Sequence, residues 1–193
     1  MTRELLIHTF SNMPTLNTER LTLRRLLISD ADDMFDYAHR EETSRYLFWS
    51  PHKNIAHTKS YLKFVKDRYR AGDFYDWAII LKDSGKMIGT CGFTNIDLTH
   101  RRGEIGYVIN PDYHRQGIAA EAARAVIGFG FEDLDMHRIE ARFIKENEAS
   151  FKVMKKLGMT LDGYLRDNIY VKGGYRTVGV CSVLATEYKN SKN

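Results

Sequence analysis

The chain has 193 residues, of which 43% are hydrophobic and 12% aromatic, so it is long enough to bury a full core. We expect one domain over residues 1–193 and no membrane segment, because no apolar run reaches the length of a bilayer span. The net charge of +4 is too small to indicate a nucleic-acid-binding protein, and the histidines follow no metal-binding spacing. Cys91 and Cys181 lie far apart, which suits a reducing compartment, so we expect a cytoplasmic protein without a metal.

The predicted elements begin with a short strand in which Leu21 and Leu23 alternate with polar residues. A helix follows, and Ser29 with Asp32 has the spacing of a capping box at its N-terminus. A second helix carries an apolar stripe over residues 61–69. The first part of the chain is therefore expected to combine one strand with two helices.

The middle of the chain carries the alternating apolar residues that are typical of strands. Residues 77–81 and 86–93 flank a turn-forming sequence at 83–85, which indicates a hairpin. A strand at 104–109 and another at 137–143 are separated by a long helix, so we expect these two strands to be parallel. The predicted fold class is α/β, with a mixed central sheet that is antiparallel early and parallel at its centre, and with flanking helices.

The stretch from His114 to Ala119 joins a strand to the long helix, which is expected to begin near Gly117. The first N–H groups of a helix have no carbonyl partner and lie at the positive end of the helix dipole, so they bind anions. Gly117 lets a phosphate approach the backbone, and Arg115 adds a charged donor. The sequence therefore predicts a phosphate or pyrophosphate site here, and neither a P-loop nor a dinucleotide-binding fingerprint competes with it.

Four further motifs accompany this loop in chain order. They are an opening strand at 18–24, a central strand at 103–111, the pair Asn147 and Ser150, and a C-terminal hairpin at 165–175. Together with the loop, they resemble the GNAT superfamily of acyl-CoA-dependent N-acyltransferases, and within it the RimJ/RimL-type ribosomal-protein N-acetyltransferases. The resemblance implies a single GNAT acetyltransferase domain, acetyl-CoA as co-substrate, a primary amine as acceptor and no metal.

The same resemblance assigns acetyl-CoA to one strand edge, one loop and the start of one helix. One backbone N–H near Val108 or Ile109 is expected to stabilise the oxyanion of the tetrahedral intermediate. Gly106 in this strand indicates a bulge or a close backbone approach. The expected cofactor-binding residues are Tyr107, Val108, Ile109, Arg115, Gln116, Gly117, Ile118, Ala119, Ala120, Asn147 and Ser150.

The reaction also needs groups that handle protons, because an amine attacks only in its neutral form. Glu104 is the first candidate acceptor of the amine's proton, and Asp167 in the hairpin is the second. Glu104 could instead be a surface charge paired with Arg101 or Arg102, and Asp167 a turn residue. Ser150 is the candidate for a hydrogen bond to the departing sulfur, or else an ordinary residue of the first helical turn.

Three positions depart from the family pattern. His114 replaces an arginine or glutamine, Met154 replaces the tyrosine that protonates the thiolate in many GNAT enzymes, and Ile169 replaces a glutamate of at least one RimL-type enzyme. These departures leave the acid and the base open.

The first expected acceptor is a protein N-terminal α-amine, as in a ribosomal protein. A small amine, such as an antibiotic or a polyamine, is the alternative acceptor, and an acetyl-CoA-binding module without turnover is an alternative function. No motif specifies the oligomeric state, so an oligomer is compatible with the sequence.

Overall fold

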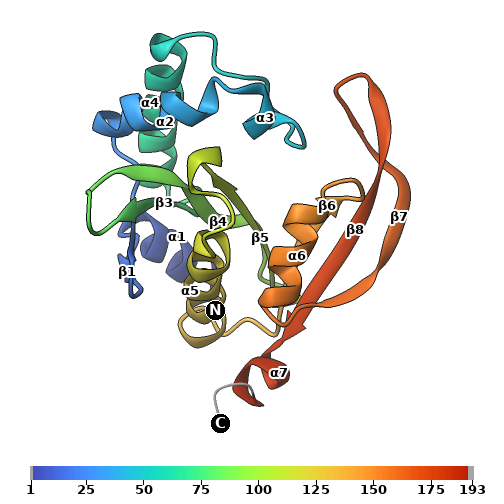
Figure 1. The fold of residues 1–193 in the computed structure, drawn as a ribbon. Helices are drawn as coiled ribbons and strands as arrows, with labels where there is room; N and C mark the ends of the chain where they lie inside the picture. Colours follow the sequence, from blue (N-terminus) through green and yellow to red (C-terminus); the bar gives the residue numbers. More distant parts are fainter. Residues whose placement is uncertain (1, 191–193) are drawn as a thin grey trace.

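A computed structural model describes residues 2–190 of the chain, and within them eight strands form one sheet (Figure 1). Its order is β1-β2-β3-β4-β5-β6-β8-β7, and β5–β6 is the parallel pair in an otherwise antiparallel sheet. This arrangement confirms the predicted α/β class and its parallel centre. The strands are β1 (Leu16–Asn17), β2 (Leu21–Arg24), β3 (Asp76–Leu81), β4 (Met87–Asp97), β5 (Arg102–Ile109), β6 (Arg138–Ile144), β7 (Thr160–Val171) and β8 (Gly174–Leu184).

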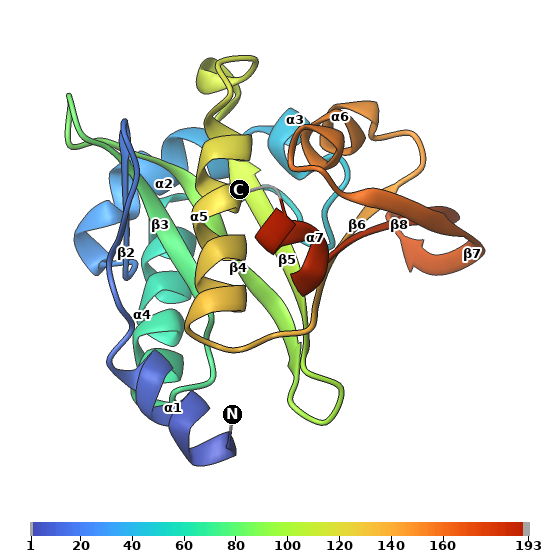
Figure 2. The ribbon, with the colours of Figure 1, turned by 90° about the horizontal axis from the view of Figure 1, so that it is seen from below.

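Helices cover both faces of this sheet (Figure 2). The α-helices are α1 (Arg3–Ser11), α2 (Ala31–Ala38), α3 (Glu41–Ser44), α4 (Ile55–Ala71), α5 (Ile118–Glu132), α6 (Glu148–Lys156) and α7 (Ala185–Asn190), and the 3-10 helices are η1 (Ile28–Asp30) and η2 (Pro111–Tyr113). Helices α1 and α5 lie on one face of β3–β5, and α2 and α4 lie on the other. No helix within residues 2–190 is long and apolar enough to cross a bilayer.

The core between α5 and the sheet fixes the position of this helix. Phe129 packs edge-on against Trp77, with ring centroids 5.5 Å apart, and both side chains are buried. At Gly130 an added Cβ atom would lie 2.7 Å from Ile139 Cδ1 and 2.9 Å from Phe93 Cζ, so glycine lets the helix pack closely against these side chains. The C-terminal part of α5 is thereby held against β3 and β6.

The sheet opens between β5 and β6. Residues 102–105 of β5 pair with 138–141 of β6, whereas residues 106–109 have no register partner on β6. Residues 142–144 of β6 continue to pair with β8 instead. The two halves of the sheet diverge here (Figure 1), so the backbone of β5 from Gly106 to Ile109 presents an edge along which an extended ligand can lie.

The β7–β8 hairpin has an irregular outer strand and a tight turn. Its register shifts between Leu161 and Gly163 and again between Leu165 and Ile169. At the turn, Lys172 and the following glycine have φ values of +49° and +79°, as in a type I′ turn. The C-terminal hairpin predicted from residues 165–175 is therefore confirmed, although both of its strands extend beyond those residues.

Two features near the N-terminus differ from the sequence prediction. Sequence reasoning missed α1, whose cap is the Thr2 hydroxyl accepting a hydrogen bond from the Leu5 N–H at 3.2 Å. The capping box assigned to Ser29 is wrong, because Asp30 turns the chain there. Its carboxylate accepts a hydrogen bond from the Leu27 N–H at 2.8 Å and pairs with Arg24 at 2.7 Å. Asp30 takes this role because its carboxylate can pair with Arg24 of β2. The pairing depends on tertiary structure, so the local sequence did not reveal it.

Candidate active site

The predicted phosphate loop lies at the N-terminus of α5, which begins at Ile118 as expected. Arg115 and Gly117 both have positive φ, +62° and +80°, so the chain bends sharply before the helix. Gly117 occupies the N-cap position without a side-chain cap, which leaves the first N–H groups of the helix to an external acceptor. The N–H groups of the first α5 turn and the exposed Arg115 side chain are therefore available to an anion.

A depression of about 500 Å³ adjoins this loop. Its lining includes Gly117 and Ala120 from the loop and helix, together with the cationic side chains of Arg20, Arg124 and Lys156. Glu19 and Glu121 also line the depression, and Glu121 pairs with Arg20, so the excess positive charge for a phosphate ligand comes from Arg124 and Lys156. Sequence reasoning did not place Arg20, Arg124 or Lys156 at this site, because the three residues come from separate elements that only the fold brings together.

Arg20 also fixes the loop from the side of β2. Its guanidinium contacts the Glu121 carboxylate at 2.6 and 2.7 Å and donates a hydrogen bond to the Gln116 carbonyl at 3.1 Å. Burial alone would raise the pKa of Glu121, but hydrogen bonds from Thr18 and Arg20 outweigh it and lower this pKa. Glu121 therefore stays ionised and holds Arg20 against the loop.

The start of α6 faces the open edge of β5. Asn147 caps this helix by accepting a hydrogen bond from the Ser150 N–H at 3.2 Å. The Ser150 hydroxyl lies 3.0 Å from the Tyr107 hydroxyl, which reaches across from β5. Met154, in contrast, is only 1% exposed and packs into the core, so the position at which many relatives carry a tyrosine presents no polar group.

Glu104 lies at the beginning of the same strand, on the opposite face from Tyr107 by strand alternation. Its carboxylate pairs with Arg142 Nε at 3.1 Å and accepts a hydrogen bond from the Thr94 hydroxyl at 3.1 Å. The pairing with Arg101 or Arg102 considered from the sequence is wrong. Arg101 pairs with Asp135 and Arg102 pairs with Asp97. Arg142 reaches Glu104 because the parallel β5–β6 register sets the two strands side by side.

Comparisons with known proteins identify the fold and the reaction class. Residues 20–160 match the family profile of the acetyltransferase (GNAT) domain. The chain belongs to the GNAT acetyltransferase family. GNAT enzymes take the acetyl group from acetyl-CoA, so this protein is an acetyl-CoA-dependent N-acetyltransferase. In the described part of the chain, residues 2–190, no group of three His, Cys, Asp or Glu residues could hold a metal ion.

The acetyltransferase is 36% identical to the uncharacterized N-acetyltransferase p20 of Bacillus licheniformis over 176 residues, 91% of this chain and 99% of that one. It is 26% identical to the [ribosomal protein uS5]-alanine N-acetyltransferase of Escherichia coli K12 over 178 residues, which cover 86% and 89% of the two chains. A crystal structure of a GNAT-family acetyltransferase from Bacillus anthracis matches with a TM-score of 0.80 at 26% identity, covering 90% of this chain and all of that one. The likeness thus extends over nearly the whole GNAT fold.

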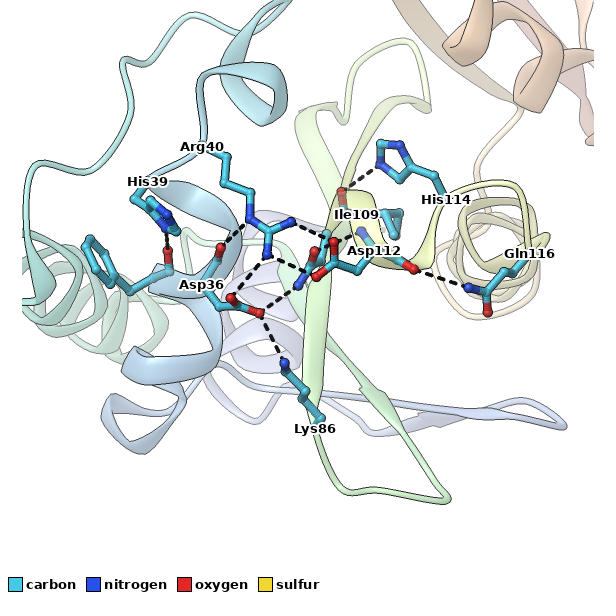
Figure 3. A network of polar contacts seen from close by, with 10 residues as sticks. Asp36, His39, Arg40, Lys86, Ile109, Asp112, His114 and Gln116 are labelled. Carbon is cyan, nitrogen blue, oxygen red and sulfur yellow. Dashed lines mark hydrogen bonds and ion pairs between the residues drawn. The ribbon is translucent and has the colours of Figure 1, made fainter.

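A polar network anchors the predicted phosphate loop of the acetyltransferase to α2 and to the residue that precedes β4 (Figure 3). Arg40 contacts the Asp112 carboxylate through two nitrogens, at 2.7 and 3.0 Å, and also contacts Asp36 at 3.2 Å. The hydrogen bond from Lys86 is the main cause of the lowered pKa of Asp36, and Asn110 donates to the same carboxylate at 3.1 Å. Bidentate pairing of this kind fixes orientation as well as distance. The chain between β5 and α5 is consequently held at its beginning by side chains from α2.

His114, which stands where the family pattern has an arginine or glutamine, has a structural role in the loop. Its Nε2 donates a hydrogen bond to the Ile109 carbonyl at 2.9 Å, so the ring folds back onto the end of β5 (Figure 3). The neighbouring Arg115 side chain is exposed beside the loop. His114 thus shapes the loop, and Arg115 is the residue whose charge faces outward.

Asp167 and Gly106 are the remaining residues that the sequence analysis singled out. Asp167 is exposed on β7 with φ +48°, inside the second register shift of the hairpin, and no described contact joins it to Glu104 or Ser150. At Gly106, where a bulge or a close backbone approach was expected, the atom near an added Cβ is a side-chain methyl carbon, Thr94 Cγ2 at 2.9 Å. The irregularity itself is in the neighbouring strand β4, between Phe93 and Asn95.

Proposed function

We propose that this GNAT enzyme acetylates the N-terminal α-amine of a protein such as a ribosomal protein. The carrying observation is a pair of aromatic side chains at the tip of the β7–β8 hairpin, Tyr170 and Tyr175, which are 64% and 65% exposed. Their rings contact each other edge-on, with centroids 5.2 Å apart, so they present a fixed aromatic surface. Exposed aromatic side chains are typical of surfaces that contact a macromolecular partner. A ribosomal acceptor also agrees with the cytoplasmic location expected from the sequence.

The hairpin tip also limits how the acceptor enters. Lys172 Nζ donates hydrogen bonds to the Ser44 carbonyl and, at 3.2 Å, to the Ser44 hydroxyl, which joins the hairpin to α3. This contact borders the acceptor side of the site, where Figure 1 shows the hairpin leaning toward α3. An extended chain end that carries an amine suits an entrance bordered in this way.

In this proposal, acetyl-CoA binds along the loop before α5 and the open edge of β5. The N–H groups of residues 115–120 hold the pyrophosphate, and the pantetheine arm follows the open edge of β5 near Tyr107, Val108 and Ile109. One of these backbone N–H groups donates to the thioester oxygen as its charge grows. Asn147 contacts the pantetheine arm, and Ser150 lies beside the sulfur.

The amine attacks the acetyl carbon, a C–N bond forms, the C–S bond breaks, and the amine loses one proton. Glu104 receives this proton directly or through water, and Asp167 is the second candidate. The Arg142 guanidinium orients the Glu104 carboxylate but also neutralises part of its charge. If neither carboxylate acts, the enzyme accelerates the reaction by holding the neutral amine beside the thioester.

A small cationic amine is the second candidate acceptor. The chain is 26% identical to the spermidine N(1)-acetyltransferase of Escherichia coli K12 over 165 residues, 85% of this chain and 84% of that one. Its identity to this relative equals its identity to the ribosomal-protein enzyme, so overall similarity does not separate the two acceptors. The buried Met154 weighs against a polyamine, because polyamine acetyltransferases often keep the tyrosine at this position.

The deciding experiment is an assay of CoA release with a panel of acceptors. The panel holds short peptides that begin with Ser, Ala, Thr or Met, matched peptides with a blocked N-terminus, spermidine and amine antibiotics. We expect turnover with free N-termini and none with the blocked peptides. Preferential turnover of spermidine or an antibiotic would replace the proposed acceptor. Tight acetyl-CoA binding without turnover of any acceptor would favour a binding module.

A further inference from the structure

Tyr107 places a second hydroxyl behind Ser150. The phenol reaches from β5 to the first turn of α6, where its oxygen lies 3.0 Å from Ser150 Oγ and 3.1 Å from the Ser150 carbonyl oxygen. The two residues are 43 positions apart in the sequence, and only the fold, in which α6 packs on α5 and β6, brings them together. The proposed function uses Ser150 and the backbone of Tyr107 but gives the phenol no role.

The phenol occupies a neighbourhood that lacks its usual polar group. Position 154 carries a buried methionine, so α6 supplies no tyrosine toward the cofactor. Burial raises the pKa of Tyr107, and the hydrogen bond to Ser150 offsets this only in part. The phenol therefore keeps its proton throughout the physiological pH range and acts as a permanent hydrogen-bond donor.

Two hydroxyl groups with one proton each can be arranged in two ways at these distances. In the first, Tyr107 donates to the Ser150 carbonyl, and the Ser150 hydroxyl donates to the Tyr107 oxygen. In the second, Tyr107 donates to Ser150 Oγ, which leaves the Ser150 proton free to point at another acceptor. Negative charge on a nearby sulfur favours the second arrangement, because charge-assisted hydrogen bonds are stronger than neutral ones.

We propose that Tyr107 is a positioning residue that turns the Ser150 hydroxyl toward the sulfur of CoA as the thioester breaks. The inference rests on the proposed function in one respect, the placement of Ser150 beside the sulfur. Rotation of two O–H bonds is sufficient, so no proton leaves Tyr107. The phenol that many relatives carry on this helix is replaced by one that acts from the strand through a serine.

The test measures how CoA affinity depends on ionisation of the CoA thiol, and it needs no amine acceptor. Calorimetry gives the affinities of CoA and acetyl-CoA at pH 7 and at pH 9.5, and acetyl-CoA has no thiol to ionise. If Ser150 donates to the thiolate, CoA affinity relative to acetyl-CoA should rise by roughly 3- to 10-fold over this interval in the parent. We expect Tyr107→Phe and Ser150→Ala each to abolish most of this rise, and the double variant to lose no more than Ser150→Ala alone.

Controls separate this role from simple packing. Tyr164→Phe removes a phenol hydroxyl from an exposed site on β7 and should keep the parent's rise. Thermal unfolding shows whether Tyr107→Phe is folded. In acceptor assays, this variant should lower kcat by roughly 10-fold with little change in the KM for acetyl-CoA.

A folded Tyr107→Phe protein with the parent's rise in relative CoA affinity would overturn the proposal, as would a parent without any rise. Both results are independent of the acceptor, so a wrong acceptor assignment leaves this test intact.

Discussion

Asp76 is expected to make the stability of the protein depend on pH. It is the first residue of β3, and its carboxylate leans over Gly92 of β4, where an added Cβ atom would lie 2.8 Å from Asp76 Oδ1. Burial raises the pKa of Asp76 to about 7, although hydrogen bonds from Thr90 and from the Trp77 N–H oppose this shift. Burial of this carboxyl group favours its neutral, protonated form over its charged form.

The sign of the effect follows from proton binding. Between pH 4 and pH 7 the folded protein binds more protons at this site than the unfolded chain, so rising pH lowers the free energy of unfolding. From pH 5 to the folded-state pKa of about 7, the loss is two pH units at about 1.4 kcal/mol each, or about 3 kcal/mol. Partial contact of the side chain with solvent reduces this to about 2 kcal/mol. Above pH 7 the loss stays constant.

Asp76→Asn removes the ionisable group and keeps its shape. We expect the variant to gain about 2 kcal/mol relative to the parent between pH 5 and pH 8, measured by urea unfolding at both pH values. In thermal unfolding, the same gain corresponds to roughly 4 to 8 °C. Asp83→Asn, in the exposed β3–β4 turn, serves as the control and should show no such gain. An Asp76→Asn difference that is equal at pH 5 and pH 8 would refute the reasoning.

Three further substitutions test the cofactor loop and the proton acceptor. Gly117→Pro deletes an N–H and is incompatible with φ +80°, so acetyl-CoA affinity should fall by roughly 10- to 100-fold in calorimetry, whereas Gly85→Ala, at φ +69° in an open turn, should bind normally. Arg40→Met releases Asp112 and should weaken acetyl-CoA binding by roughly 3- to 10-fold, and an equal loss in Arg70→Met, which breaks an exposed ion pair elsewhere, would contradict this. Glu104→Gln should lower turnover by roughly 10- to 1000-fold and remove the rise of the rate with pH, whereas Glu140→Gln, which also contacts Arg142, should keep that rise. A pH profile that follows the free amine in both proteins would turn attention to Asp167.

Local sequence signals were sufficient where one element determines its own structure. The apolar period of α5 and the glycine before it located the start of the helix, and the helical crossover predicted that β5 and β6 are parallel. The pair Asn147 and Ser150 was recognised as a motif because its members are only three positions apart, and Asn147 caps α6 through the Ser150 N–H. These features depend on neighbours in the chain, so a single sequence carries them.

Contacts between distant segments were not readable in the same way. Arg142 pairs with Glu104 because of a strand register, and Arg20 reaches the phosphate loop from β2. Neither position has a local pattern that distinguishes it from other surface arginines. Tyr107 was assigned to the cofactor through its backbone, but its hydroxyl contact with Ser150 depends on how α6 packs. Sequence therefore located the loop, whereas the partners of its charged groups required the fold.

The irregular register of β7 has a consequence for association between chains. An outer strand of this length would normally offer a continuous row of N–H and C=O groups to any other extended chain. In β7 the register shifts divide the pairing with β8 into runs of two or three residues, and Asp167 with positive φ lies within the second interruption. Such bends prevent a foreign strand from continuing the sheet across them. The backbone irregularity around Asp167 thus also protects this edge of the sheet from uncontrolled growth into fibrils.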